Sequence, residues 1–198
     1  MVKERILLIV ILAFALDGLL GDPYGWPHPV RGIGRMIAKA ESLLRNLLPR
    51  SKWGEHLGGG ILVIAIGGST YALTWLLLAG LERVSAAAAF LAEVWLCYQI
   101  LAARSLQQES RRVYEALAKG DLQAARAAVA MIVGRDTQKL DFEGVTKAAI
   151  ETVAENTSDG VIAPLFYMLL GGAPLGLLYK SINTMDSMLG YKNARYQY

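Results

Sequence analysis

The feature that most constrains the fold of this chain is an uncharged stretch of 25 residues at positions 57–81, "LGGGILVIAIGGSTYALTWLLLAGL". A helix needs roughly 20 mainly apolar residues to cross the hydrocarbon core of a bilayer, and glycine is frequent in such helices. After the short "ER" at 82–83, a second apolar run covers 84–103 and contains one charged residue, Glu93. The two runs therefore predict a helical hairpin in a membrane.

Two further apolar stretches are candidate membrane segments. Residues 6–20 form a short run that reaches Asp17. No small-residue cleavage site precedes the polar residues that follow, so we expect a retained first helix rather than a signal peptide. Residues 160–179 carry no charge, but Pro164, Pro174 and a Gly-Gly pair interrupt them. Non-helical backbone at membrane depth is tolerated only where protein or a water-filled cavity covers it, so we expect a broken or re-entrant segment here.

The polar segments between these runs also predict helices. Over 104–159, apolar residues recur at helical spacing, Gly120 suits a helix end and Asp121 the next helix start. An alanine-rich helix is expected to run to about Val133, and Asp141 can cap a third helix over 142–156. Residues 21–35 are rich in Pro and Gly and predict turns, followed by a short amphipathic helix over 36–48. The fold class predicted is an all-α, polytopic integral membrane protein with a single membrane domain over 1–198.

Charge predicts the orientation and excludes some partners. The 21–56 loop holds six Lys and Arg residues and the 104–159 loop holds eight. Lys and Arg favour the cytoplasmic side, so both loops are expected in the cytoplasm of a multi-pass protein of the cell (inner) membrane. A net charge of +3, with basic and acidic residues interspersed, argues against a nucleic-acid partner. The single cysteine, Cys97, excludes a disulfide framework within the chain.

A set of carboxylates precedes the interrupted apolar run. Glu151, Glu155 and Asp159 are spaced four apart, which places at least the first two on one helix face. Like charges at this spacing repel and call for a cation, and Asn156 adds another oxygen. Hard oxygen ligands suit Mg²⁺, which proteins usually hold with one or two carboxylates plus substrate phosphates. The three carboxylates are therefore predicted metal ligands; the alternative is a solvated helix face.

Three other groups of residues are candidates for binding anions. Arginine grips phosphate or carboxylate in bidentate fashion, and capping, turns and lysine snorkelling are the alternative explanations. Glu93, inside an apolar run, needs a partner or a cavity, and Arg104 is one candidate partner. The candidates are Arg135 and Asp136 in "GRDTQKLD", Lys180, Asn183, Asp186 and Lys192 in "YKSINTMDSMLGYKN", and His28 and Arg31 in "GDPYGWPHPVR".

Three stretches together carry a family resemblance. They are "LDGLLGDPYGWPHPVRGIGR", the hydrophobic hairpin, and the block from "GRDTQKLDFEGVTKAAIETVAENTSDGVIAPLFY" to "SINTMDSMLGYKN". They resemble the adenosylcobinamide-phosphate synthase (CobD/CbiB) family of cobalamin biosynthesis. The resemblance implies an integral membrane ligase that joins a carboxylate of adenosylcobyric acid, a corrinoid, to aminopropanol or its phosphate, using ATP.

The resemblance identifies the motifs but not the duty of each residue, so we assign expected roles from the chemistry of the side chains. Mg²⁺–ATP is assigned to Glu151, Glu155 and Asp159, with Asp136 and Asp186 as additional ligands. Phosphate is assigned to Arg135, Lys180 and Lys192, and the substrate carboxylate or amide to Asn156 and Asn183. His28 and Arg31 complete the mouth of the site.

The chain also departs from the family pattern. Members generally continue well beyond the equivalent of Tyr198, so a missing C-terminal segment, or a homo-oligomer, is expected to complete this one. The open alternatives are a non-catalytic membrane sensor or regulator on the same scaffold, an inactive fragment of the synthase, and a transporter. A transporter would explain the interrupted segment and Glu93.

Overall fold

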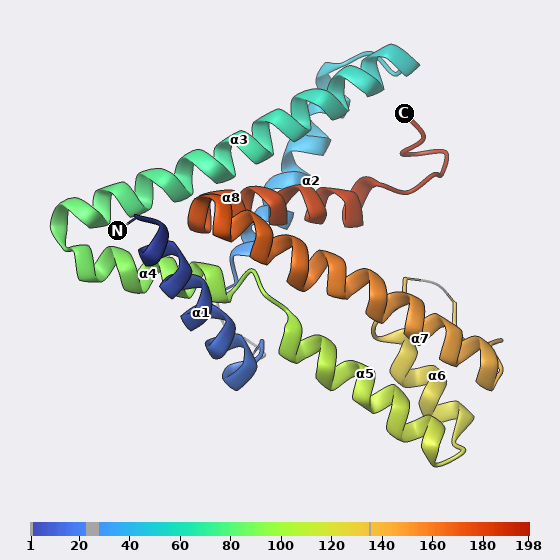
Figure 1. Cartoon of the computed structure of the whole chain (residues 1–198). Coiled ribbons are helices and arrows are strands. Elements are labelled where there is room, and N and C mark those ends of the chain that lie inside the picture. The colour runs from blue at the N-terminus through green and yellow to red at the C-terminus, as the bar shows by residue number, and fades with distance from the viewer. Residues whose placement is uncertain (1, 23–27, 135) are drawn as a thin grey trace.

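The computed structural model describes residues 2–22, 28–134 and 136–198, and these residues form helices with no strand. The prediction of an all-α protein is confirmed. Figure 1 shows the long helices α3 and α8 crossing the upper part of the molecule, with α5, α6 and α7 grouped at the lower end. In chain order the elements are α1 (Val2–Leu20), α2 (Pro29–Leu47), α3 (Lys52–Val84), α4 (Ala86–Tyr98), α5 (Ala103–Ala118), α6 (Leu122–Ala130), α7 (Phe142–Thr157), the π-helix η1 (Ser158–Ile162) and α8 (Ala163–Leu189).

Three helical stretches within the described residues are long and apolar enough to cross a membrane: Lys52–Val84, Ala86–Ala118 and Phe142–Leu189. On α3, large apolar side chains such as Ile64 and Leu73 are 77% and 59% exposed. Water would disfavour so broad an apolar surface, whereas lipid accommodates it. The span predicted at 6–20 lies in α1, which is not one of the three stretches, so its crossing of the bilayer stays a prediction.

The predicted hairpin is formed by α3 and α4. Ser85 makes the turn, because its N–H donates to the carbonyl of Leu81 at 2.7 Å and its Oγ accepts from the N–H of Ala88 at 3.3 Å. The second apolar run is not one helix as its length suggested. It breaks after Tyr98, and α5 begins only at Ala103.

The last apolar segment is broken at Gly171–Gly172. Gly172 has φ +65° and ψ −157°, a backbone conformation that is open essentially to glycine alone. Figure 1 shows the two parts of α8 meeting at this point and running in different directions. The break is as expected for an interrupted segment; that the segment re-enters the membrane stays a prediction.

Glu93 of α4 supports this break. Its carboxylate accepts a hydrogen bond from the N–H of Ala173 and lies 3.8 Å from the guanidinium of Arg5. Arg5 also pairs with Glu82 at 3.1 Å. The candidate partner, Arg104, is therefore wrong: it lies in α5, where its guanidinium donates to the side chain of Gln107 at 3.1 Å. The contacts of Arg5 instead join α1, the end of α3 and α4 beside the break in α8.

The other end of the molecule holds α5, α6 and α7. They enclose a small core of their own that includes Val113, Val129 and Val145. Asp121 and Asp141 cap α6 and α7 as predicted, accepting from the N–H groups of Ala124 and Gly144 at 2.9 and 2.8 Å. The alanine-rich helix ends at Ala130, three residues earlier than expected.

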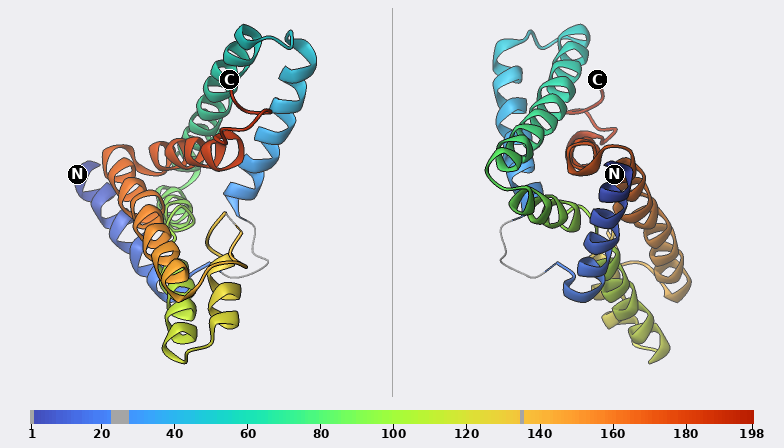
Figure 2. Two further views of the ribbon diagram at one scale, coloured as in Figure 1. Left: turned by 90° about the vertical axis from the view of Figure 1, so that its right-hand side faces the viewer. Right: turned by 60° about the vertical axis from the view of Figure 1, so that its left-hand side comes forward.

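The first polar loop contains more helix than its Pro and Gly content suggested. Turns were predicted through residue 35, but α2 begins at Pro29. Proline suits the first position of a helix, because its fixed φ is helical and the N–H it lacks would have no intrahelical partner there. Figure 2 shows α2 and α3 on one side of the molecule, with the C-terminal tail beside them, and α5 and α6 projecting on the other.

Candidate functional site

The π-helix between α7 and α8 positions the acidic end of the "ENTSDG" motif. Pro164 has no N–H, so the carbonyl of Gly160, four residues before it, is left without its usual intrahelical donor. That carbonyl accepts instead from the N–H of Ala102 at 3.1 Å, in the break between α4 and α5. The wide turn is thereby fixed to a second element, and Asp159 lies within it, partly buried.

Asp159 faces three residues of α8 that lie beyond the glycine break. The amide of Asn183 donates to its Oδ2 at 3.4 Å, and the hydroxyl of Tyr179 donates to its backbone carbonyl at 3.2 Å. Tyr179 and Asn183 are four residues apart and share a helix face. The ammonium of Lys180, also partly buried, interacts electrostatically with Asp159. The stacked ring of Tyr167, 5.0 Å from that of Tyr179, adds an aromatic side to the cluster.

The loop after α1 contributes polar groups to the same cluster. Asp22 interacts electrostatically with Lys180, and its Oδ1 lies 4.0 Å from Nε2 of His28. The charges of Lys180 and Arg31 both act on the His28 ring. We call the group of Asp22, His28, Arg31, Asp159, Tyr179, Lys180 and Asn183 the polar cluster.

The surroundings of His28 favour its neutral form. Its Nδ1 accepts from the N–H of Val30 at 3.2 Å and so caps α2. Burial lowers the pKa of His28, Lys180 and Arg31 lower it further, and Asp22 opposes them. The neutral ring with its proton on Nε2 is therefore favoured, because Nδ1 can accept only when it carries no proton. His28 thus has the hydrogen-bonding role that is commoner for a lone histidine, and it presents Nε2–H toward Asp22.

A buried carboxylate anchors the start of this loop. Asp17 is 1% exposed, and its Oδ2 accepts from the N–H of Arg104 at 3.2 Å. The first N–H groups of a helix have no intrahelical acceptor, and Ala102 at the N-cap position has no side chain that could accept from them. Asp17 supplies that acceptor at the start of α5. The hydroxyl of Tyr98 donates to the carbonyl of Gly21, whose φ of +63° turns the chain out of α1. These contacts fix where Asp22 leaves α1.

The structure gathers only part of the predicted site. His28, Arg31, Asp159, Lys180 and Asn183 come together, whereas the other predicted residues lie elsewhere. Three of these, Glu151, Glu155 and Asn156, are exposed on α7. Asp136 is also exposed and accepts a hydrogen bond from the N–H of Gln138. Asp186 is exposed near the end of α8, and Lys192 is exposed in the tail. Arg135 falls outside the described residues.

The predicted metal site is not formed as a cluster of three carboxylates. Among the residues that the structure describes, no three His, Cys, Asp or Glu side chains lie where they could hold a metal ion together. Glu151 and Glu155 are exposed along α7, while Asp159 is directed toward α8. The even spacing of four assumed a continuous α-helix, whereas the π-helix changes the helical register at Ser158.

Sequence reasoning missed Asp22, Tyr179, Asp17 and Tyr98. Asp22 and Tyr179 lie in stretches that were already singled out, the first in the stretch that contains His28 and the second next to Lys180. The only available signal for Asp17 was an acidic residue inside an apolar run. Tyr98 gave no signal, because a tyrosine in an apolar run is ordinary.

By its fold the chain is a polytopic, all-helical membrane protein with a polar cluster beside its broken helix. Its residues 10–198 match the family described as CobD/Cbib protein, and the chain belongs to that family. It is 47% identical over 192 residues to "Cobalamin biosynthesis protein CobD" of Listeria monocytogenes, covering 97% of this chain and 60% of the relative. It is 44% identical over 186 residues to "Cobalamin biosynthesis protein CbiB" of Salmonella typhimurium, covering 94% and 58%.

The chain spans about 60% of the length of the curated relatives it matches. No solved structure matches it.

Proposed function

We propose that this chain acts in cobalamin biosynthesis and carries catalytic residues of an ATP-dependent, amide-forming ligase of the membrane. The reaction proposed joins a carboxylate of adenosylcobyric acid to the amine of aminopropanol or of its phosphate. ATP would activate the carboxylate by phosphoryl transfer, and the amine would then displace phosphate to form the amide. The names of the relatives support the pathway, while the reaction itself rests on the family resemblance and on the chemistry of the site.

The observation that supports this proposal most is the convergence of the polar cluster from three separate elements. Arg31 and Lys180 supply two cations at one place, which suits phosphate and carboxylate groups. Asp22 and Asp159 balance them, so the cluster is close to neutral before substrates arrive. A site that must neutralise phosphates and also hold an amine needs both signs of charge.

Each residue can be given a role on these grounds. Lys180 and Arg31 would bind the phosphates of the nucleotide. Asn183, whose amide both donates and accepts, would orient the substrate carboxylate and later the product amide. Asp22 would accept a hydrogen bond from the incoming ammonium and then take its proton, so that the neutral amine can attack the acyl carbon.

Magnesium would be bound in this cluster by fewer protein carboxylates than the three that were predicted. Mg²⁺ is commonly bound through one or two carboxylates, with nucleotide phosphates and water supplying the other ligands. Asp159 is the carboxylate that fits, because it is partly buried and lies beside Lys180. Bound Mg²⁺ would neutralise phosphate charge; Glu151 and Glu155 would act, if at all, from the exposed face of α7.

The test is amide formation in liposomes that contain the chain, adenosylcobyric acid, aminopropanol phosphate and Mg²⁺–ATP. A fusion that continues into the unmatched remainder of the Listeria relative is assayed in parallel. Product from the chain alone would place the whole site within these 198 residues. Product from the fusion alone would show that another segment completes it. If neither forms product, the ligase proposal is wrong.

The residue test uses whichever form is active. Lys180→Met should lower the rate at least a hundredfold, because preorganised charge at a reacting phosphate is worth about two to three powers of ten. The matched control is Lys119→Met, which removes an exposed lysine at the end of α5, far along the chain from the cluster. Equal rates for the two variants would contradict the role of the polar cluster.

A further inference from the structure

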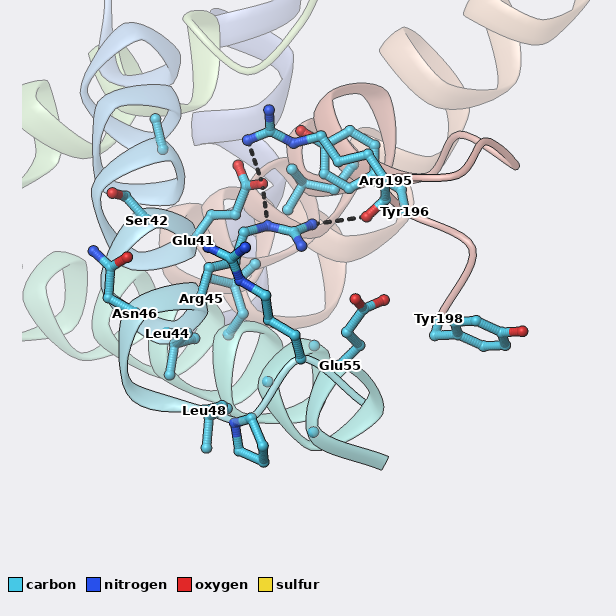
Figure 3. A pocket seen from close by; sticks show the side chains of 18 residues that line it. Glu41, Ser42, Leu44, Arg45, Asn46, Leu48, Glu55, Arg195, Tyr196 and Tyr198 are labelled. Atoms are coloured by element: carbon cyan, nitrogen blue, oxygen red, sulfur yellow. Dashed lines mark hydrogen bonds and ion pairs between the residues drawn. The ribbon is translucent and has the colours of Figure 1, made fainter. Parts of the chain in front are cut away.

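A cavity lies at the corner where α2 is followed by α3, lined by none of the residues of the polar cluster. Its volume is about 880 Å³, and the tail after α8 closes one side of it. Figure 3 shows Glu41 and Arg45 of α2, Glu55 of α3 and the tail residues Arg195 and Tyr196 around the same space. Pockets of roughly 300–1,000 Å³ hold small-molecule ligands.

A charge network holds the tail over this cavity. Glu41 accepts from Arg45 at 2.8 Å and from Arg195 at 3.1 Å, and Arg45 also donates to the backbone carbonyl of Arg195 at 2.9 Å. Burial acts to raise the pKa of Glu41, but the hydrogen bonds and charges of the two arginines lower it overall. The ring of Tyr196 lies 5.3 and 5.4 Å from the two guanidinium groups. One carboxylate is thus shared by two cations.

Further positive charge surrounds the opening. Arg50 also lines the cavity, so the side chains of the lining include three arginines and two glutamates, Glu41 and Glu55, and together carry a net positive charge. Lys52 lies beside it, with its ammonium 5.0 Å from the centre of the Tyr198 ring. Among the residues that the structure describes, Arg50 and Lys52 form no ion pair. The cavity therefore favours an anionic group.

Most of the remaining lining is apolar, with Ser42 and Asn46 as the polar exceptions. The apolar side chains are those of four leucines, Leu44, Leu48, Leu62 and Leu189. Along α3 the wall of the cavity is formed by glycines, Gly54, Gly58 and Gly59, which have no side chains. At Gly59 an added Cβ would meet nothing within 4 Å. Gly54 and Leu62 are eight residues apart along α3, so the lining extends about 12 Å along that helix, from charged residues into the apolar run.

The surroundings place this cavity at the membrane boundary of the predicted orientation. The uncharged run of α3 begins at Leu57, within the stretch of the helix that lines the cavity. Trp53, Leu47 and Leu43 are 72%, 69% and 59% exposed beside it. Tryptophan is enriched at membrane–water interfaces, and basic pockets on the cytoplasmic side of membrane helices bind lipid headgroups.

We propose that this cavity binds an anionic phospholipid. Arg45, Arg50 and Arg195 hold the phosphate, and the acyl chain follows the leucines and the glycine wall of α3. A phospholipid matches the lining because it too carries negative charge at one end and hydrocarbon at the other. This site goes beyond the ligase proposal, and it is formed by residues that the polar cluster does not use.

The test measures retained lipid by native mass spectrometry of the whole chain, extracted from membranes of mixed phosphatidylglycerol and phosphatidylcholine. We expect phosphatidylglycerol to be retained preferentially. Each arginine near a membrane surface contributes enough to weaken anionic-lipid binding about fivefold when lost, so Arg50→Gln should lower retention by that factor. Arg50→Gln with Arg195→Gln should lower it about twentyfold or more. Arg50→Lys, which keeps the charge, should retain most of the binding.

The control is Arg83→Gln, which removes an exposed arginine at the far end of α3. Helical circular dichroism confirms that each variant is folded. Equal retention of the two lipids, or equal losses from Arg50→Gln and Arg83→Gln, would overturn the proposal. So would binding of soluble ATP or inorganic phosphate that requires Arg50 while phosphatidylglycerol does not. No substrate is present, so the result is independent of whether the chain makes amides.

Discussion

Replacing Gly172 with alanine should destabilise the fold through both the backbone and a side-chain contact. The φ of +65° at this residue is costly for alanine, by about 1–3 kcal/mol. The added Cβ would also overlap Oε1 of Glu93. The carboxylate of Glu93 accepts a hydrogen bond from the N–H of Ala173, so this bond would be disturbed. Disturbing a hydrogen bond to a charged group costs about 1.5–3 kcal/mol. Together the two effects predict a loss of about 3 kcal/mol or more.

The assay is equilibrium unfolding in mixed detergent micelles, followed by circular dichroism, with Gly68→Ala as the matched control. Gly68 lies in α3, and a Cβ there meets nothing within 4 Å, so alanine should stabilise the helix by about 0.5–1 kcal/mol. In a Glu93→Ala background, Gly172→Ala should cost only the backbone part, because the carboxylate it disturbs is already gone. A Gly172→Ala protein as stable as the Gly68→Ala protein would refute the reasoning.

Two further predictions concern the start of the polar cluster. Asp17→Ala should lower the free energy of unfolding by about 1–2 kcal/mol, because α5 loses its cap. Asp17→Asn should lower it by less. Equal stability of these two variants and the unchanged protein would contradict the capping role. His28 has a lowered pKa, so its contribution to stability should be present above about pH 6.5, its ordinary pKa, and lost as pH falls through the folded value. Unfolding measured across this range should show that slope, and His28→Asn, which can still cap α2, should flatten it; an unchanged slope would show that another group titrates.

The sequence alone determined the fold class and the main membrane helices. Uncharged runs of this length have one stable arrangement in lipid, because helices satisfy their backbone hydrogen bonds internally. Local rules also placed the caps at Asp121 and Asp141 and the interruption near Gly171–Gly172. Motif resemblance supplied the family, which the match over residues 10–198 confirmed.

Tertiary structure decided which of the candidate residues meet. The spacing of four at Glu151, Glu155 and Asp159 suggested one site, yet the π-helix and its contact with Ala102 direct Asp159 toward α8. The partner of Glu93 is Arg5, a residue 88 positions away in the sequence, and no local rule relates the two. Such contacts depend on how whole helices pack, and the packing is set by side chains from many parts of the chain at once.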